Sequence, residues 1–213
     1  MAAAAGLGAA AALGLQPWGL WPLTVIGLAG VPLALGSVSP GRAAWIGWAF
    51  GVGYFAVALA WIVEPFLVDV ELHGWMAPFA LVFSAGGFAL FWAAAFGLAG
   101  WIARRPAARI AVLAVTWASA ELARGYILTG FPWGAPGQVW IGTPVAQLLS
   151  WIGPQGLTFV TLATCLPLGV CALRGQRLVV RIAVLLPFAA AAVVVLALPA
   201  PPPPDRTAET GFV

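Results

Sequence analysis

Lysine is absent from this sequence, and ionisable side chains of every kind are scarce. Nine arginines supply the basic charge, aspartate and glutamate together number six, and His73 is the single histidine. Without lysine, these residues exclude a Walker A nucleotide loop and a Schiff-base lysine. A serine hydrolase is not indicated either, because no serine lies in a Gly-x-Ser-x-Gly context and there is no second histidine.

What the sequence has in abundance is apolar surface. Of its 213 residues, 63% are hydrophobic and 7% are charged, and the mean hydropathy is +1.03. Such a composition belongs in a bilayer rather than in water. A spanning helix needs ~20 apolar residues, so the chain has room for about six to eight spans and no large soluble domain. We therefore expect an all-α, polytopic transmembrane helix bundle.

Apolar runs separated by proline, glycine or charge predict about seven helices. The first is short for a span, and it lacks the basic start of a cleaved signal peptide, so we expect it to be a retained helix. The predicted helices are Ala2–Leu15, Leu20–Leu35, Ala43–Val63, Met76–Ile102, Ala108–Ile127, Val145–Leu173 and Leu178–Leu198.

Arginines cluster in alternate connections between these helices, which predicts the orientation. Short arginine-rich connections remain in the cytoplasm, whereas most acidic residues here fall toward the other side. The N-terminus is then cytoplasmic and the C-terminus periplasmic. The same clustering at helix ends argues against a nucleic-acid-binding face. The arginines concerned are Arg42, Arg104, Arg105, Arg109, Arg174, Arg177 and Arg181.

The C-terminal residues differ in composition from everything before them. Residues 1–199 form the predicted transmembrane domain, and 200–213 contain a proline run followed by polar residues. A proline run cannot continue a helix and favours an extended conformation. We expect a periplasmic linker toward a catalytic domain that these residues do not include.

Two groups of potential metal ligands or reactive thiols have a structural interpretation. Cys165 and Cys171 lie six apart in one apolar run, which turns them to different helix faces, so we expect packing roles. An acidic loop could offer oxygen ligands, but a solvated loop is favoured because metal sites need several converging ligands. Its residues are Glu64, Asp69, Glu71 and His73. We expect no metal and no cofactor.

Glu121 and Arg124 carry charge inside a predicted span. Three residues apart, they share a helix face and can pair. Counting from Arg109, they lie roughly 18 Å and 22 Å along the helix, in the outer third of a ~30 Å core. A charge there costs up to ~3 kcal/mol, so the pair indicates a functional or architectural site. The alternative is a snorkelling arginine with its partner closing the helix end.

The segment Thr129–Thr143 follows this pair and is uncharged, rich in glycine, proline and aromatic residues. It is either an aromatic belt at the outer interface or a lip that contacts lipid. We favour lipid contact. The candidate binding or architectural residues are Glu121, Arg124, Thr129, Phe131, Pro132, Trp133 and Trp61.

These elements together resemble a known family. The order Glu121-x-x-Arg124-Gly125, then Thr129-Gly130-Phe131-Pro132-Trp133, then Gln147 and Gly153-x-x-Gly156, is similar to the membrane domain of apolipoprotein N-acyltransferases. Pro17-Trp18-x-x-Trp21-Pro22-Leu23, Trp61 and the Glu64–Pro78 loop also fit that family in order and position.

The resemblance implies an enzyme of the bacterial cytoplasmic membrane. Members move an acyl chain from a phospholipid to the α-amino group of an N-terminal diacylglyceryl-cysteine on a lipoprotein. A periplasmic nitrilase-like domain, placed after the seventh span, carries their Glu-Lys-Cys triad. This sequence has no lysine and no cysteine outside the sixth predicted helix. We therefore expect no catalytic residues and no activity from these residues alone.

Two other functional classes stay open at this stage. A small transporter or channel would use Glu121 and Arg124 to line a path, but it predicts internal repeats between halves, which the sequence does not display. A non-catalytic lipid-binding module that works with a separate catalytic chain fits the same residues.

Overall fold

The computed structural model describes residues 1–127 and 130–171, together with residues 182, 185–186, 189 and 193. Within these residues the chain is helical and contains no strand. The α-helices are α1 (Ala2–Ala12), α2 (Trp21–Leu35), α3 (Pro40–Ala58), α4 (Val70–His73), α5 (Ala77–Ile102), α6 (Pro106–Arg124) and α7 (Leu149–Cys171), and the 3-10 helices are η1 (Ala60–Leu67), η2 (Gly74–Met76), η4 (Pro136–Trp140) and η5 (Pro144–Leu148). The predicted all-α class is confirmed for this part of the chain.

The predicted helix ends needed correction where the backbone bends. The run Ala43–Val63 is not one helix, because α3 ends at Ala58 and η1 continues at an angle of 46°. The run Val145–Leu173 is broken at Gly153, whose φ of +67° is left-handed and suits glycine. The predicted helix Leu178–Leu198 lies almost entirely outside the described residues, and the linker 200–213 lies wholly outside them.

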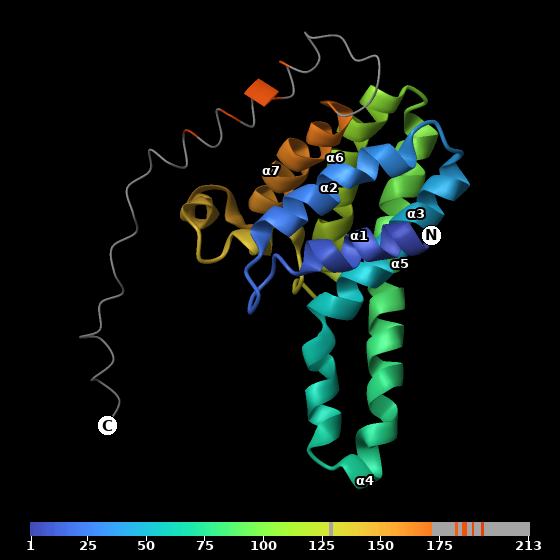
Figure 1. The fold of residues 1–213 in the computed structure, drawn as a ribbon, viewed down its shortest axis with the longest axis vertical. Helices are drawn as coiled ribbons and strands as arrows, with labels where there is room; N and C mark the ends of the chain where they lie inside the picture. Colours follow the sequence, from blue (N-terminus) through green and yellow to red (C-terminus); the bar gives the residue numbers. More distant parts are fainter. Residues whose placement is uncertain (128–129, 172–181, 183–184, 187–188, 190–192, 194–213) are drawn as a thin grey trace, which may run out of the picture.

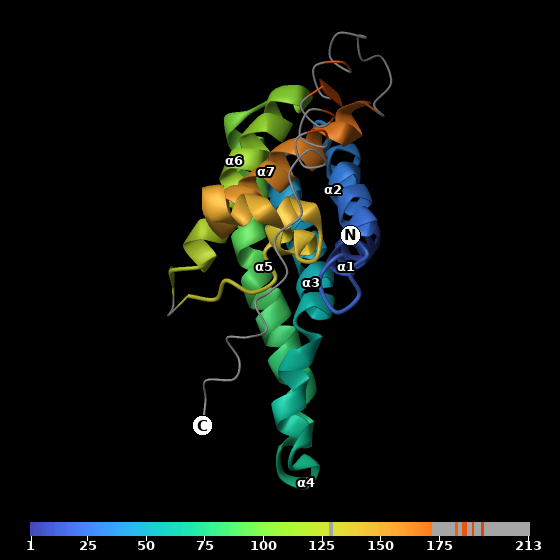
Figure 2. The same cartoon turned by 90° about the vertical axis from the view of Figure 1, so that its left-hand side faces the viewer.

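The helices form a body with one projecting arm. Figures 1 and 2 show α1, α2, α3, α6 and α7 gathered around the C-terminal part of α5. The N-terminal part of α5 runs away from this body beside η1, and α4 lies at the far end. We call η1, α4, η2 and that part of α5 the arm.

Small residues bring the helices of the body close together, and α3 carries three of them at Gly47, Gly51 and Gly53. A Cβ atom on Gly47 would lie 2.5 Å from the Phe96 ring, and one on Gly51 would lie 2.9 Å from the Cβ of Ala89. A Cβ on Gly53 would collide with the Ala5 carbonyl of α1. Glycine at these three positions therefore permits α3 to pack between α1 and α5.

Aromatic rings fill the centre of the body. The Trp92 ring of α5 is fully buried and lies 4.6 Å from Trp117 of α6, 4.8 Å from Phe55 and 4.9 Å from Tyr54, measured between ring centroids. Tilted and edge-on ring pairs at these separations contribute about 0.5–1.5 kcal/mol each beyond their buried area. This cluster fixes α3, α5 and α6 relative to one another.

Arg109 joins two connections at the end of the body opposite the arm. Its side chain is 4% exposed, and it donates to the carbonyls of Ala103 at 3.1 Å, Gly36 at 3.2 Å and Val38 at 2.9 Å. The α2–α3 and α5–α6 connections therefore lie at the same end, as the alternation of arginines predicts. Which side of a membrane this end faces stays a prediction.

Two described helical segments are long and apolar enough to cross a bilayer, namely Val70–Ile102 and Pro144–Cys171. A third exists if α3 and η1 count as one bent span. By contrast, α1 and α2 have 11 and 15 residues, fewer than the ~20 that a straight span needs. The predicted count of seven spans therefore stays a prediction.

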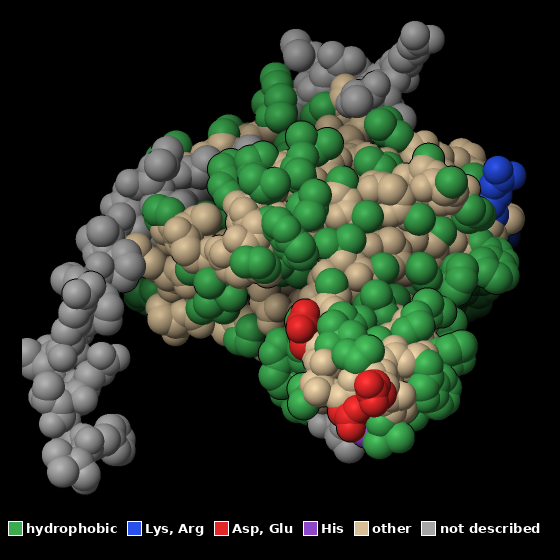
Figure 3. Space-filling model, turned by 60° about the horizontal axis from the view of Figure 1, so that its bottom comes forward, with side chains coloured by type: hydrophobic (Ala, Val, Ile, Leu, Met, Phe, Trp, Pro, Cys, Tyr) green, Lys and Arg blue, Asp and Glu red, His purple; other side chains and the backbone are tan. Residues whose placement is uncertain are grey.

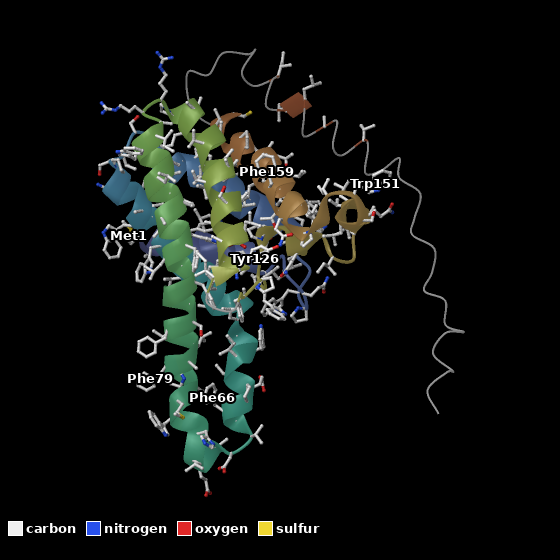
Figure 4. All side chains as sticks on the ribbon, turned by 180° about the vertical axis from the view of Figure 1, so that it is seen from behind. Met1, Phe66, Phe79, Tyr126, Trp151 and Phe159 are labelled. Carbon is white, nitrogen blue, oxygen red and sulfur yellow. The ribbon has the colours of Figure 1, made fainter. Side chains whose placement is uncertain are left out.

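The outer surface is apolar on both the arm and the body. Phe79 on the arm is 55% exposed, Trp151 at the start of α7 is 83% exposed, and both side chains point outward (Figure 4). Seen from the arm end, apolar side chains surround the acidic residues of the arm (Figure 3). A surface of this kind suits contact with hydrocarbon or with its interface.

Candidate functional site

Glu121 and Arg124 form the predicted ion pair at the end of α6. Arg124 Nη2 lies 2.6 Å from Glu121 Oε2, and Arg124 Nε donates to Glu121 Oε1 at 3.1 Å. This bidentate arrangement suits the planar guanidinium. Arg124 is 1% exposed and Glu121 is 7% exposed. The charged groups therefore lie inside the protein rather than reaching toward an interface as a snorkelling arginine would.

Further hydrogen bonds join the pair to other parts of the chain. Trp92 Nε1 donates to Glu121 Oε1 at 2.7 Å. Arg124 Nη1 donates to the carbonyl of Phe131 and, at 2.8 Å, to that of Trp133. The backbone N–H of Phe131 donates in turn to the carbonyl of Arg124 at 3.0 Å. The pair thus links the core of the body to the loop that follows α6.

Aromatic faces complete the surroundings of Arg124. Its guanidinium carbon lies 5.1 Å from the centre of the Phe55 ring and 5.8 Å from that of Phe88. Phe131 stacks on Phe88 at 4.6 Å with an interplanar angle of 17°, and it also contacts Trp133 at 5.3 Å. Cation–π contacts of this kind contribute more when they are desolvated. Arg124 therefore holds the loop through its backbone carbonyls, while Phe88 of α5 holds it through the ring of Phe131.

This geometry favours the architectural interpretation of the pair. Neither charged group is accessible, and both are hydrogen-bonded to protein partners. An incoming ligand would contact the loop that Arg124 holds instead of Arg124 itself. We define the lip as residues 130–134, the described part of the predicted contact segment next to the pair.

A small pocket opens beside the lip. It has a volume of about 150 Å³ and brings together Trp61 of η1 and Trp133 of the lip, two of the candidate residues. Both indoles are about half exposed, at 50% and 55%. Gln16 and Gln138 line the same pocket, with apolar neighbours from α3 and the outer loops. The arrangement offers indole and amide groups beside apolar surface.

Gln16 and Gln138 were missed by the sequence analysis. Gln16 Nε2 donates to the carbonyl of Ile141 at 3.1 Å, although the two residues are 125 positions apart. Gln138 accepts from the Gly134 N–H at 2.9 Å and donates to the Pro132 carbonyl at 3.1 Å. A signal was present, because glutamine in an apolar connection needs partners for its amide. The identity of those partners depends on tertiary contacts.

The other predicted sites have plainer outcomes. Thr129 lies outside the described residues. Pro132 contributes its carbonyl to the Gln138 contact. In the described chain, no three His, Cys, Asp or Glu side chains come together as a set of metal ligands. Asp69 instead accepts from the N–H of Leu72 at 3.3 Å and starts α4.

Comparison with known proteins gives a consistent result. The family described as "Apolipoprotein N-acyltransferase N-terminal domain" matches residues 7–167. The chain is 44% identical to the apolipoprotein N-acyltransferase of Caulobacter vibrioides over 165 residues, which are 73% of this chain and 30% of that protein. It is 40% identical to that of Rhodopseudomonas palustris over 166 residues, which are again 73% of this chain and 30% of that protein. It is 31% identical to that of Vibrio parahaemolyticus over 191 residues, which are 86% of this chain and 37% of that protein.

Proposed function

This chain belongs to the apolipoprotein N-acyltransferase family and corresponds to the N-terminal part of its members, and from that premise we propose that it forms their lipid-holding membrane domain. The aligned region spans about a third of the length of these relatives, 30% in Caulobacter vibrioides and 37% in Vibrio parahaemolyticus. The reaction of the whole enzyme transfers an acyl chain from a phospholipid to the N-terminal amine of a diacylglyceryl-cysteine lipoprotein. The site of action is the bacterial cytoplasmic (inner) membrane, which the domain crosses several times.

The observation that carries this proposal is the Arg124-held lip beside the pocket of Trp61 and Trp133. No charged residue occurs between Arg124 and Arg174, although this interval contains the long connection between α6 and α7. A water-exposed loop of that length would be expected to carry charge, whereas an uncharged loop with exposed rings suits the interface with lipid. The lip and pocket therefore contact the phospholipid acyl donor.

The orientation follows from the arginine-bearing end. With Arg42, Arg104 and Arg105 on the cytoplasmic side, the lip and the arm face the periplasm. The helix α5 has 26 residues and a length of roughly 39 Å, longer than the ~30 Å hydrocarbon core, so its N-terminal turns project beyond it. The arm and the lip then form the platform on which a periplasmic catalytic domain rests.

The chemical step needs residues that these 213 do not contain. The resemblance implies a thioester on a cysteine, assisted by glutamate and lysine, and there is no lysine here. Cys165 is fully buried within α7. The polypeptide Met1–Val213 is therefore inactive by itself and supplies lipid binding and positioning.

The test uses Met1–Val213 purified and reconstituted in phospholipid vesicles with a diacylated lipopeptide. Mass spectrometry measures the N-acylated product, with a complete family enzyme such as that of Caulobacter vibrioides as positive control. We expect product from the complete enzyme only. Product formed by Met1–Val213 would contradict the assignment of catalysis to residues elsewhere.

A further inference from the structure

Resting on the proposed function, we infer that the pocket between Trp61 and Trp133 takes the glycerol–ester region of a phospholipid and does not read the charge of its headgroup. Three features of the pocket carry this inference: its size, the neutrality of its lining and the donors that its indoles supply.

The pocket is too small for a whole lipid. Its volume is about 150 Å³, the space of roughly five water molecules at ~30 Å³ each. Sites that enclose a drug-sized molecule measure about 300–1,000 Å³. The pocket therefore holds one group of a few heavy atoms, while the acyl chains and the headgroup extend outside it.

The lining has no means of recognising charge. None of the described residues that line the pocket has an ionisable side chain. Arg124, which supports the lip, is 1% exposed, and four of its N–H donors are occupied by Glu121 and by two backbone carbonyls. A phosphate needs arginine, lysine or converging backbone amides for strong binding. The pocket thus suits a neutral polar group and gives an anionic headgroup no advantage.

The polar groups that are available match an ester. An indole N–H is a donor only, and an ester carbonyl is an acceptor only, so Trp61 and Trp133 are complementary to it. Gln16 bonds to Ile141, and Gln138 bonds to Gly134 and Pro132, which fixes the backbone on both sides of Trp133. The apolar remainder of the lining accommodates the glycerol carbons and the first methylenes.

The experiment measures lipid binding to detergent-purified Met1–Val213 by native mass spectrometry. The probes are diacyl phosphatidylcholine, diacyl phosphatidylglycerol with the same chains, and the diether analogue of phosphatidylcholine, which lacks both ester carbonyls. The variants are Trp61→Ala, Trp61→Phe and Trp133→Ala. Trp45→Ala is the matched control, since Trp45 is 61% exposed on α3 and lies outside this pocket.

We expect the two diacyl lipids to bind with dissociation constants within about twofold of each other. The diether lipid binds about three- to tenfold more weakly, the range of one net hydrogen bond. Trp61→Ala weakens both diacyl lipids alike, and Trp61→Phe keeps the ring but loses the preference for ester over ether. Trp45→Ala changes neither comparison.

The outcomes separate this inference from the proposed function. Two results overturn the ester assignment and leave the lipid-holding role intact. One is a preference of tenfold or more for the anionic lipid. The other is equal binding of the diether and diacyl lipids that still depends on Trp61. Lipid binding that no pocket variant alters overturns the lipid-holding role of the pocket as well.

Discussion

Replacing Arg124 with glutamine should destabilise the domain more than any other single change in the site. The substitution leaves the buried Glu121 carboxylate without its counter-charge and frees the carbonyls of Phe131 and Trp133. Breaking a buried ion pair from one side costs about 3–5 kcal/mol in proteins. Because Arg124 is 1% exposed, solvent cannot replace the lost partner without local opening.

Glu121→Gln should cost less than Arg124→Gln, about 3 kcal/mol at the lower end of that range, although it too leaves a buried charge without its partner. The amide oxygen of glutamine still accepts from Trp92 Nε1, and Arg124 keeps its two carbonyl partners and its contacts with Phe55 and Phe88. The double variant Glu121→Gln/Arg124→Gln should lose about 2 kcal/mol less than the sum of the single variants, because it contains no orphaned charge.

The assay is unfolding by SDS in mixed micelles, followed by tryptophan fluorescence, which gives a free energy of unfolding for each variant. Limited proteolysis of the lip provides a second reading, since Arg124→Gln should expose the backbone around Phe131. If the two single variants were equally mild and added without coupling in the double variant, the ion pair would not be what holds the lip.

Three further predictions concern other parts of the fold. Gly53→Leu should lower the free energy of unfolding by at least about 1–3 kcal/mol, because the new side chain collides with α1 at Ala5. Gly87→Leu should be tolerated, since a Cβ at Gly87 has no neighbour within 4 Å. SDS unfolding measures both variants. Arg109→Gln should lower the free energy of unfolding by about 3 kcal/mol, because its hydrogen bonds to the carbonyls of Ala103, Gly36 and Val38 are lost. Arg104 is exposed, so Arg104→Gln should change it by less than about 0.5 kcal/mol in the same assay. Maleimide should label Cys171, which is partly exposed, before Cys165, which is fully buried, as peptide mass spectrometry of the folded protein in detergent would measure; equal labelling rates would contradict the packing of α7.

Local features of the sequence predict much of this arrangement. The apolar runs locate α1, α2, α5, α6 and α7 because hydrocarbon leaves the backbone few alternatives to a helix. The pairing of Glu121 with Arg124 follows from their spacing of three residues.

Long-range partners were not predictable in the same way. Periodicity within one helix does not reveal that Trp92 of α5 completes the Glu121 site or that Gln16 reaches Ile141 across the fold. Arg109 was used only to predict the membrane orientation, because a charge at a helix end usually faces water. In the structure its guanidinium is buried against backbone carbonyls of two connections. The bend after Ala58 that forms the arm leaves the hydropathy unbroken, so it too was missed.

The central claim, that this chain is the lipid-holding domain of an N-acyltransferase, is tested most directly by a chimera. Residues 7–167 would replace the aligned residues of the Caulobacter vibrioides enzyme, to which the chain is 44% identical, and mass spectrometry would measure N-acylation of a lipoprotein. We predict an active chimera whose activity falls with Arg124→Gln and with Trp133→Ala. A chimera that folds and binds lipid but forms no N-acylated product would contradict the claim.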